Sequence, residues 1–148
     1  MIHRLLLLIG FLIATNASAG GWCWDAAGAA QNVSPLILRA IAAQESQCGQ
    51  SNFHRNETSA DHGPMQINDR WLRDVRFRRL GVTFADLYEP CTANYIAAWV
   101  VATCYKQYGV TWQAIGCYNA QTYSKQMKYA NDIYQRIQRY LKTGKGIC

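Results

Sequence analysis

The chain has 148 residues, half of them hydrophobic, with 15 Lys and Arg side chains against 9 Asp and Glu and a net charge of +6. This length suits one compact domain with its own core rather than several domains. A basic chain can bind nucleic acid. This chain, however, has six cysteines and begins with the export signal described next, and an exported, disulfide-bonded protein rarely meets nucleic acid.

The first nineteen residues have the three parts of a secretory signal peptide. His3 and Arg4 form a short charged start, the run LLLLIGFLIA is apolar, and the ASA ending at Ala19 matches a cleavage site. The apolar run is shorter than the roughly 20 residues of a spanning helix. We therefore expect residues 1–19 to be removed on export to the periplasm, the alternative being an uncleaved membrane anchor. The domain at 20–148 keeps 14 basic against 9 acidic side chains, with no other segment that could enter a membrane stably.

All six cysteines lie in that domain. An even number of cysteines in an exported chain favours three disulfides over a metal site or reactive thiols. No CxxC or Cys/His cluster at ligand spacing occurs, so we expect neither a metal nor another cofactor. A bridge from Cys23 to Cys91 would tie the N-terminal helix to the segment before a long helix. The sequence alone does not determine how the other four cysteines pair. Our working expectation for them is Cys48–Cys117 and Cys104–Cys148.

The pattern along the chain is helical nearly throughout. A short first helix is expected over residues 22–31. A second helix begins at Pro35, because Ser34 is a good N-cap and proline is favoured at the first helical position. Residues 49–62 are rich in Gly, Ser, Asn and charge, which is typical of a long loop with room for a minimal β-hairpin.

The middle of the chain predicts three more helical segments. Residues 65–80 have helical character and stop at Gly81, and Thr83 begins a short helix. A long buried helix over residues 93–108 ends at Gly109, a residue type common just after helices.

The C-terminal part predicts two further helices. Thr111 caps residues 112–119, and Ser124 starts the last helix, which is amphipathic. No strand-like alternation of any length and no repeat or linker divides the chain. The sequence therefore predicts an all-α domain stabilised by disulfides. The apolar stripe of the last helix is Met127, Ala130, Ile133, Ile137 and Leu141.

Five arginines crowd into the stretch DRWLRDVRFRR. Outside the cytoplasm, such a cluster can attract an anionic polymer. A solvated helix face explains it equally well. The arginines are Arg70, Arg73, Arg76, Arg78 and Arg79.

Glu45 is the first candidate for chemistry. It lies on the same helical stripe as Ile37 and Ile41, which precede it by eight and four residues. Burial disfavours the charged form of a carboxyl and raises its pKa, as a general acid requires near neutral pH, and the acid glutamate of lysozyme shows this effect in a hydrophobic pocket. Alternatively, Glu45 reaches solvent at the helix end, since Cys48 and Gly49 follow.

Two other segments carry polar groups suited to a ligand. GPMQIN, from Gly63 to Asn68, combines a flexible glycine with the amide of Gln66. CYN ends in Tyr118 and Asn119, a phenol and an amide suited to sugar rings and hydroxyls. Each alone is equally typical of an ordinary turn or a core tyrosine.

Together, QES, GPMQIN and CYNA occur in that order in one exported helical domain. In this they resemble the lytic transglycosylase domain of the soluble-transglycosylase type, in particular its small members associated with secretion systems, conjugation and pili. The resemblance covers essentially all of residues 20–148. It implies a lysozyme-like α-helical fold. It also implies cleavage of the peptidoglycan bond between N-acetylmuramic acid and N-acetylglucosamine, which leaves a 1,6-anhydromuramic end.

The resemblance also implies roles for individual residues. Glu45 and Ser46 match the catalytic Glu-Ser pair, with Glu45 as acid and then base and Ser46 orienting the acid or the substrate. Tyr118 and Asn119 match the Ala-Tyr-Asn motif, whose tyrosine hydrogen-bonds the catalytic carboxylate. The cleft motif Gly-Leu-Met-Gln is matched by Gly63, Met65, Gln66 and Ile67. The sequence departs from the family at Pro64, Cys117 and Gln121.

Two interpretations of Asp61 are open. Some secretion-associated members of the family carry an aspartate here, near the place of the second carboxylate of a lysozyme. Alternatively, Asp61 stabilises a turn through backbone hydrogen bonds. We expect it to assist the reaction without being essential, and we expect His54 and His62 to lie at the surface or the cleft edge.

Three functions compete. The leading expectation is an exported peptidoglycan lytic transglycosylase that opens the wall locally for a secretion, conjugation or pilus apparatus, with components of that machinery as partners. The first alternative is a hydrolytic muramidase that uses Glu45 and Asp61. The second is a non-catalytic wall-binding module, against which the retained acid argues.

Overall fold

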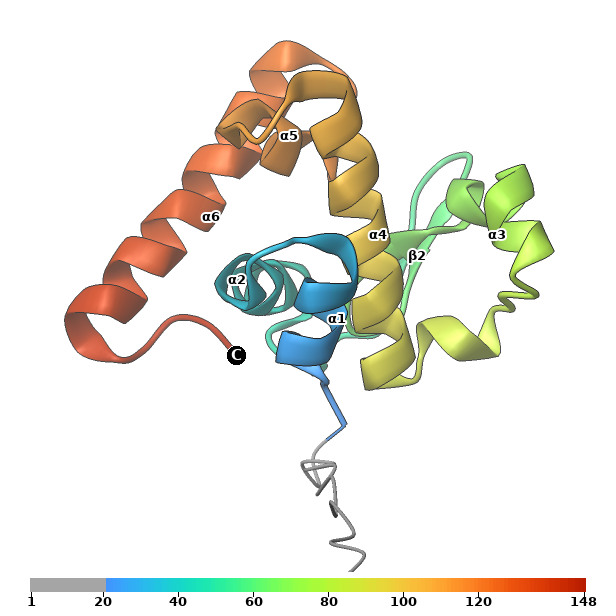
Figure 1. Ribbon diagram of the computed structural model, residues 1–148, viewed down its shortest axis with the longest axis horizontal. Helices are drawn as coiled ribbons and strands as arrows, with labels where there is room; N and C mark the ends of the chain where they lie inside the picture. Colours follow the sequence, from blue (N-terminus) through green and yellow to red (C-terminus); the bar gives the residue numbers. More distant parts are fainter. Residues whose placement is uncertain (1–20) are drawn as a thin grey trace, which may run out of the picture.

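The computed structural model describes residues 21–148, so the expected signal peptide lies outside the described residues. Figure 1 shows a mostly helical molecule in which α2 and α4 lie centrally, α6 lies on one side, and the sheet and α3 lie on the other. This arrangement confirms the expected mostly helical, disulfide-bonded domain. The helices are α1 (Trp24–Gln31), α2 (Pro35–Ser46), α3 (Val75–Arg79), α4 (Pro90–Tyr108), α5 (Trp112–Cys117) and α6 (Tyr123–Thr143), with 3₁₀ helices η1 (Asp69–Arg73) and η2 (Ala85–Leu87).

One hydrophobic core joins α2, α4 and the inner face of α6. Leu38 and Ile41 of α2 and Val101 of α4 have no exposed surface, and Ile133 of α6 packs in the same cluster. The helix α4 begins at Pro90 because the Glu89 side chain accepts hydrogen bonds from two backbone N–H groups of its first turn. None of the helices in residues 21–148 combines the length and the apolar character that crossing a bilayer requires.

The buried face of α6 differs from the expected stripe. The helix begins at Tyr123, one residue before the expected start. Leu141 is 65% exposed, so the buried face ends at Ile137. Two polar side chains, Gln126 and Tyr129, are buried on this face instead.

A small antiparallel sheet forms where a loop or hairpin was expected. The strands β1 (Phe53–Arg55) and β2 (Ala60–His62) form the hairpin, and β3 (Ile67–Asn68) adds a third strand beside β2. The expectation of one helical segment over residues 65–80 is therefore wrong. Asn68 and Asp74 have extended backbones, and each accepts a hydrogen bond from the N–H group two residues on, which divides the segment into β3, η1 and α3.

Gly63 fixes how the sheet meets the rest of the molecule. Its φ is +71°, and a Cβ atom there would lie 1.6 Å from the carbonyl oxygen of Leu87. Only glycine combines this backbone conformation with so close an approach. The end of β2 therefore packs directly against η2.

Three disulfides connect distant parts of the chain. Cys23 pairs with Cys91 as expected. The other expected pairs are wrong. Cys48, just after α2, pairs with Cys148, whose N–H and carbonyl also bond Arg39 of α2. Cys104 of α4 pairs with Cys117 of α5, because these helices pack against each other.

Candidate active site

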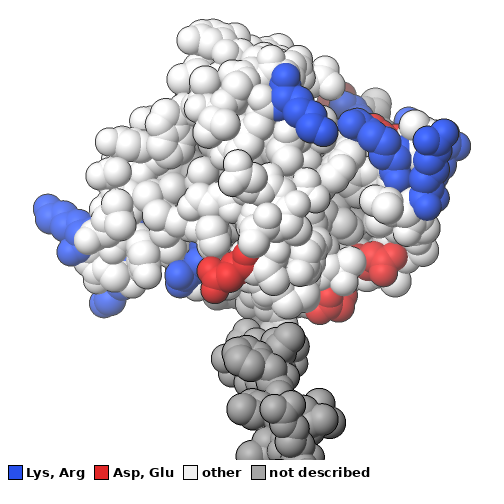
Figure 2. Space-filling model, viewed as in Figure 1, with Lys and Arg blue, Asp and Glu red and all other residues white. Residues whose placement is uncertain are grey.

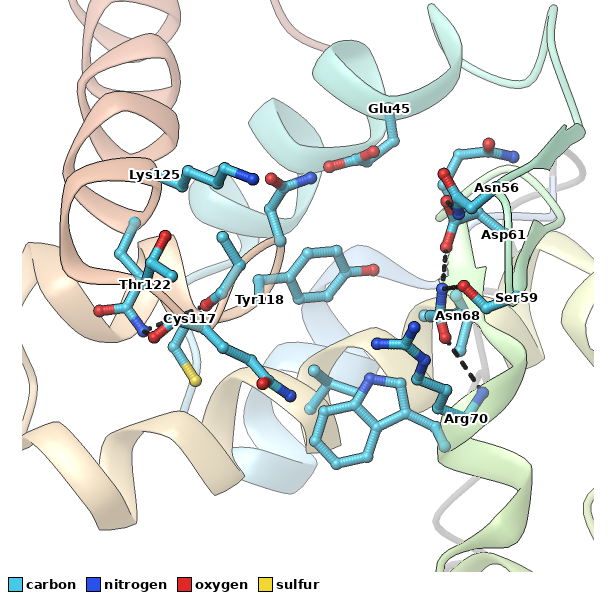
Figure 3. Close-up of a pocket in the computed structure, with 18 of the residues that line it drawn as sticks. Glu45, Asn56, Ser59, Asp61, Asn68, Arg70, Cys117, Tyr118, Thr122 and Lys125 are labelled. Atoms are coloured by element: carbon cyan, nitrogen blue, oxygen red, sulfur yellow. Dashed lines mark hydrogen bonds between the residues drawn. The ribbon is translucent and has the colours of Figure 1, made fainter.

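A cleft of about 1160 Å³ is lined on one side by residues of the sheet and η1 and on the other by residues at the end of α5 and the start of α6. Figure 3 shows Glu45 above the cleft, Asp61 and Asn68 on one side, Lys125 and Thr122 on the other, and Tyr118 between them. Four side chains expected from the sequence for catalysis or binding line this cleft together with Glu45 and Asp61. They are Gln66, Ile67, Tyr118 and Asn119.

Glu45 lies in the last turn of α2, half-buried at the cleft. Burial raises its pKa from 4.5 to about 7, and the negative charge of Asp61 also acts to raise it. A hydrogen bond from Tyr129 and the charge of Arg136 act in the opposite direction. A large fraction of Glu45 therefore carries a proton at neutral pH.

The hydroxyl that donates to Glu45 belongs to Tyr129, not to Tyr118 as expected. Tyr118 donates instead to the carbonyl oxygen of Met65, at 2.7 Å. The two phenol rings stack nearly parallel, with centroids 6.4 Å apart. Burial raises the pKa of both phenols well above the usual value, so both remain hydrogen-bond donors.

Sequence reasoning missed Tyr129, although a signal existed. It lies four residues before Ile133, so it shares the buried face of the amphipathic helix. A buried phenol nearly always has a hydrogen-bond partner. A tyrosine on this stripe was therefore a candidate partner for a buried acid.

Three residues expected to contact substrate are instead buried beneath the cleft. Met65 has no exposed surface, and Gly63 packs on Leu87. Ser46 is 1% exposed, and its hydroxyl donates to the carbonyl of Pro64 at 2.6 Å. These contacts fasten the end of α2 to the segment that carries Gln66.

The part of that segment that faces the cleft has an unusual backbone conformation at Gln66. Gln66 has a φ of +47°, and its side-chain amide donates to the carbonyl of Gly63 at 2.8 Å. The turn presents Gln66 and Ile67 to the cleft while Met65 points into the core. On the facing wall, Cys117 also lines the cleft, and its disulfide to Cys104 fixes the residue before Tyr118.

Asp61 faces the cleft from the middle of β2. Its Oδ1 accepts a hydrogen bond from Asn68 at 2.7 Å and its Oδ2 accepts one from Asn56 at 2.8 Å. Asn68 donates also to the hydroxyl of Ser59. Side-chain amides, rather than the backbone N–H groups of a turn, therefore hold this carboxylate.

The two histidines of the hairpin do not share one environment. His54 is exposed on β1, opposite Asp61 in the register. His62 is 9% exposed, and its Nδ1 lies 3.0 Å from the hydroxyl of Tyr88. The expectation of a surface position for His62 is wrong, because alternation along β2 directs it away from the cleft into a cluster with Phe53 and Phe84.

Nothing in the described part of the chain, residues 21–148, gathers three or more His, Cys, Asp or Glu side chains in a way that could hold a metal ion. The cleft instead offers the Glu45 carboxyl with its raised pKa, the amide-held carboxylate of Asp61 and several side-chain amides. Such a set can transfer protons and form hydrogen bonds with a polar polymer.

The amino-acid sequence is similar to a protein family and to several known proteins. A family model described as "Transglycosylase SLT domain" matches residues 22–140. Protein IpgF of Shigella flexneri is 39% identical over 123 residues, which cover 79% of this chain and 80% of that protein. Invasion protein IagB of Salmonella typhimurium is 30% identical over 144 residues, covering 93% of this chain and 88% of that protein. X polypeptide of Escherichia coli is 32% identical over 154 residues, covering 99% of this chain and 89% of that protein.

Proposed function

The chain belongs to the transglycosylase SLT family, and from that premise we propose how its cleft cleaves the glycan strands of peptidoglycan. It is a peptidoglycan lytic transglycosylase with a lysozyme-like helical fold. Enzymes of the family break the β-1,4 bond between N-acetylmuramic acid and N-acetylglucosamine without adding water. The muramic 6-hydroxyl oxygen forms the new bond to C1, giving a 1,6-anhydro end.

Glu45 is the acid and base of this reaction. The observation that carries the proposal is the position of its carboxyl at the cleft, held by Tyr129, where burial raises its pKa to about 7. A carboxyl that keeps its proton can give it to the glycosidic oxygen as the bond breaks. Tyr129 donates to Oε1, which leaves Oε2 to carry the transferable proton. The resulting carboxylate then takes the proton of the muramic 6-hydroxyl as its oxygen attacks C1, so Glu45 returns to its starting state.

Asp61 assists from the sheet side of the cleft. Its carboxylate can stabilise the positive charge that develops on the sugar ring, and Asn56 and Asn68 keep it in place. The same placement favours a second candidate function, a muramidase in which Asp61 supports hydrolysis. In either function Gln66, Ile67, Tyr118 and Asn119 line the sugar site, while Ser46, Gly63 and Met65 position it.

The proposed setting is the periplasm, where the enzyme opens the wall locally for a secretion, conjugation or pilus apparatus. Three disulfides support an oxidising compartment. Similarity to the invasion protein IagB supports a link to secretion machinery. The export proposal requires removal of residues 1–19, so mass spectrometry of the protein from the periplasmic fraction should find a chain that starts at Gly20. An intact N-terminus at Met1 would contradict it.

The function is tested on purified sacculi with three variants. Glu45→Gln should lower the rate of muropeptide release by at least about 10²-fold, the scale of general acid–base catalysis. Asp61→Asn should lower it less and leave the anhydro ends unchanged. Asp25→Asn, exposed on α1 outside the cleft, is the matched control and should act like the wild type.

The products separate the competing functions. Anhydro ends from the wild type support the transglycosylase, and reducing ends together with complete loss in Asp61→Asn support the muramidase. A Glu45→Gln protein that is folded by circular dichroism and still releases muropeptides at the wild-type rate would overturn the proposed mechanism.

A further inference from the structure

The cleft contains three cationic side chains that the acid–base chemistry does not use. Arg70 and Arg73 come from η1, and Lys125 comes from the first turn of α6. All three reach solvent at the cleft. Arg70 and Lys125 lie on opposite sides of the cleft, with Tyr118 between them (Figure 3).

No carboxylate of residues 21–148 neutralises these three cations, since the ion pairs there are Arg76–Asp74 and Lys128–Asp132. The guanidinium of Arg70 donates to the neutral hydroxyl of Thr58 at 2.9 Å. The charged neighbours that shift the pKa of Glu45 are Asp61 and Arg136. The cleft cations are therefore available to a ligand and do not serve to ionise the acid.

The rest of the arginine-rich stretch behaves differently. On the face shown in Figure 2, basic side chains gather on the side where α3 lies. Arg76 there binds Asp74 and lies over the ring of Trp99, 4.6 Å from its centroid. Neither Arg78 nor Arg79 lines the cleft, although both are exposed. The positive charge at the cleft is thus a separate feature contributed by η1 and α6.

The anionic groups of a peptidoglycan strand are carboxylates on the lactyl-peptide substituents of muramic acid. The N-acetylated sugar rings are uncharged, whereas the lactyl group of each muramic acid ends in a carboxylate or continues into a peptide that carries carboxylates. Resting on the proposed function, we propose that Arg73 and Lys125, supported by Arg70, bind carboxylates on the lactyl-peptide substituents of the muramic acid residues. Exposed cations bind carboxylates by charge-assisted hydrogen bonds, and a strand held from both walls crosses the cleft beside Glu45.

The test compares two double variants that remove the same charge. Arg73→Gln with Lys125→Gln removes two cleft cations whose side chains have no hydrogen-bond partner within residues 21–148, so the fold should be kept. Arg79→Gln with Lys142→Gln removes two exposed cations outside the cleft. Each protein is assayed on soluble glycan strands that carry their peptides and on strands whose peptides an amidase has removed.

The cleft double variant should lose about fivefold in kcat/KM, mainly through a higher KM, as expected for two exposed charge contacts. The loss should shrink as salt is added. The control double variant should stay close to the wild type.

The outcomes separate the two sources of carboxylate. A loss confined to peptide-bearing strands assigns the cations to peptide carboxylates, and an equal loss on both strands assigns them to the lactyl carboxylate. No loss on either strand, or an equal loss in the control double variant, would overturn the inference. A wild type that cleaves neither strand would overturn the proposed function instead.

Discussion

At the scale of single residues, the burial of Glu45 serves catalysis by raising the pKa of its carboxyl, and it lowers the stability of the folded protein when that carboxyl is ionised. A neutral carboxyl is inexpensive to bury, but an ionised one is not, which is why burial raises its pKa to about 7. The folded protein therefore binds a proton at Glu45 more tightly than the unfolded chain does. The contribution of this bound proton to the free energy of unfolding is fully present below pH 4.5, and it is lost as the pH rises through about 7.

Replacing Glu45 by Gln should stabilise the protein at alkaline pH. At pH 8 the free energy of unfolding of Glu45→Gln should exceed that of the wild type by about 3 kcal/mol, because the amide is neutral at every pH. The difference should vanish near pH 4, and urea unfolding at the two pH values measures it. Glu57→Gln, in the exposed hairpin turn, should show no such gain. An equal gain for Glu45→Gln at both pH values would argue against a raised pKa.

At the scale of elements, the junction of β2 and η2 should tolerate no side chain at Gly63. Gly63→Ala combines a positive φ with a Cβ atom inside the Leu87 carbonyl, and should lower the free energy of unfolding by about 3 kcal/mol or more. Gly81→Ala is the matched control, since its φ is +69° and no atom lies within 4 Å of the added Cβ. It should lose only about 1–2 kcal/mol. Equal losses in urea unfolding would show that backbone conformation alone explains the requirement.

At the scale of the whole molecule, the disulfides should differ in what they contribute. The Cys48–Cys148 bridge closes a loop of 100 residues, whereas Cys104–Cys117 closes one of 13. Longer loops lose more entropy in the unfolded chain when they are bridged. Replacing Cys48 and Cys148 by Ala should therefore lower the unfolding free energy by about 1–2 kcal/mol more than replacing Cys104 and Cys117. Calorimetry of the two double variants measures the difference, and the reverse order would contradict it.

The features that sequence reasoning predicted correctly depend on neighbours in the chain. Thr111 accepts the N–H of Ala114 and starts α5, and Gly109 follows the last residue of α4, as expected. Glu45 could be singled out because its stripe is set by helical spacing alone. Propensity, capping and periodicity act over a few residues, so one sequence reveals them.

The features that were missed depend on distances across the fold. Which tyrosine reaches Glu45 depends on how α6 crosses α2, and Cys148 reaches Cys48 only because the C-terminal residues return to Arg39. The division of residues 65–80 was missed for another reason. The side chains of Asn68 and Asp74 accept hydrogen bonds from nearby backbone N–H groups and interrupt the helix, although the residue pattern favours a continuous one. The spacing of residues alone did not show that these hydrogen bonds would form.

The alternation along β2 has a consequence for insertions and deletions. Asp61 faces the cleft and His62 faces the aromatic cluster because they are neighbours on one strand. A shift of the hairpin by a single residue would exchange the two faces, which would move the carboxylate out of the cleft and bring an imidazole into it. Changes of length between Arg55 and Ala60 can therefore be accommodated only in the turn. The electrostatics of the cleft thus depend on the register in which β1 and β2 pair.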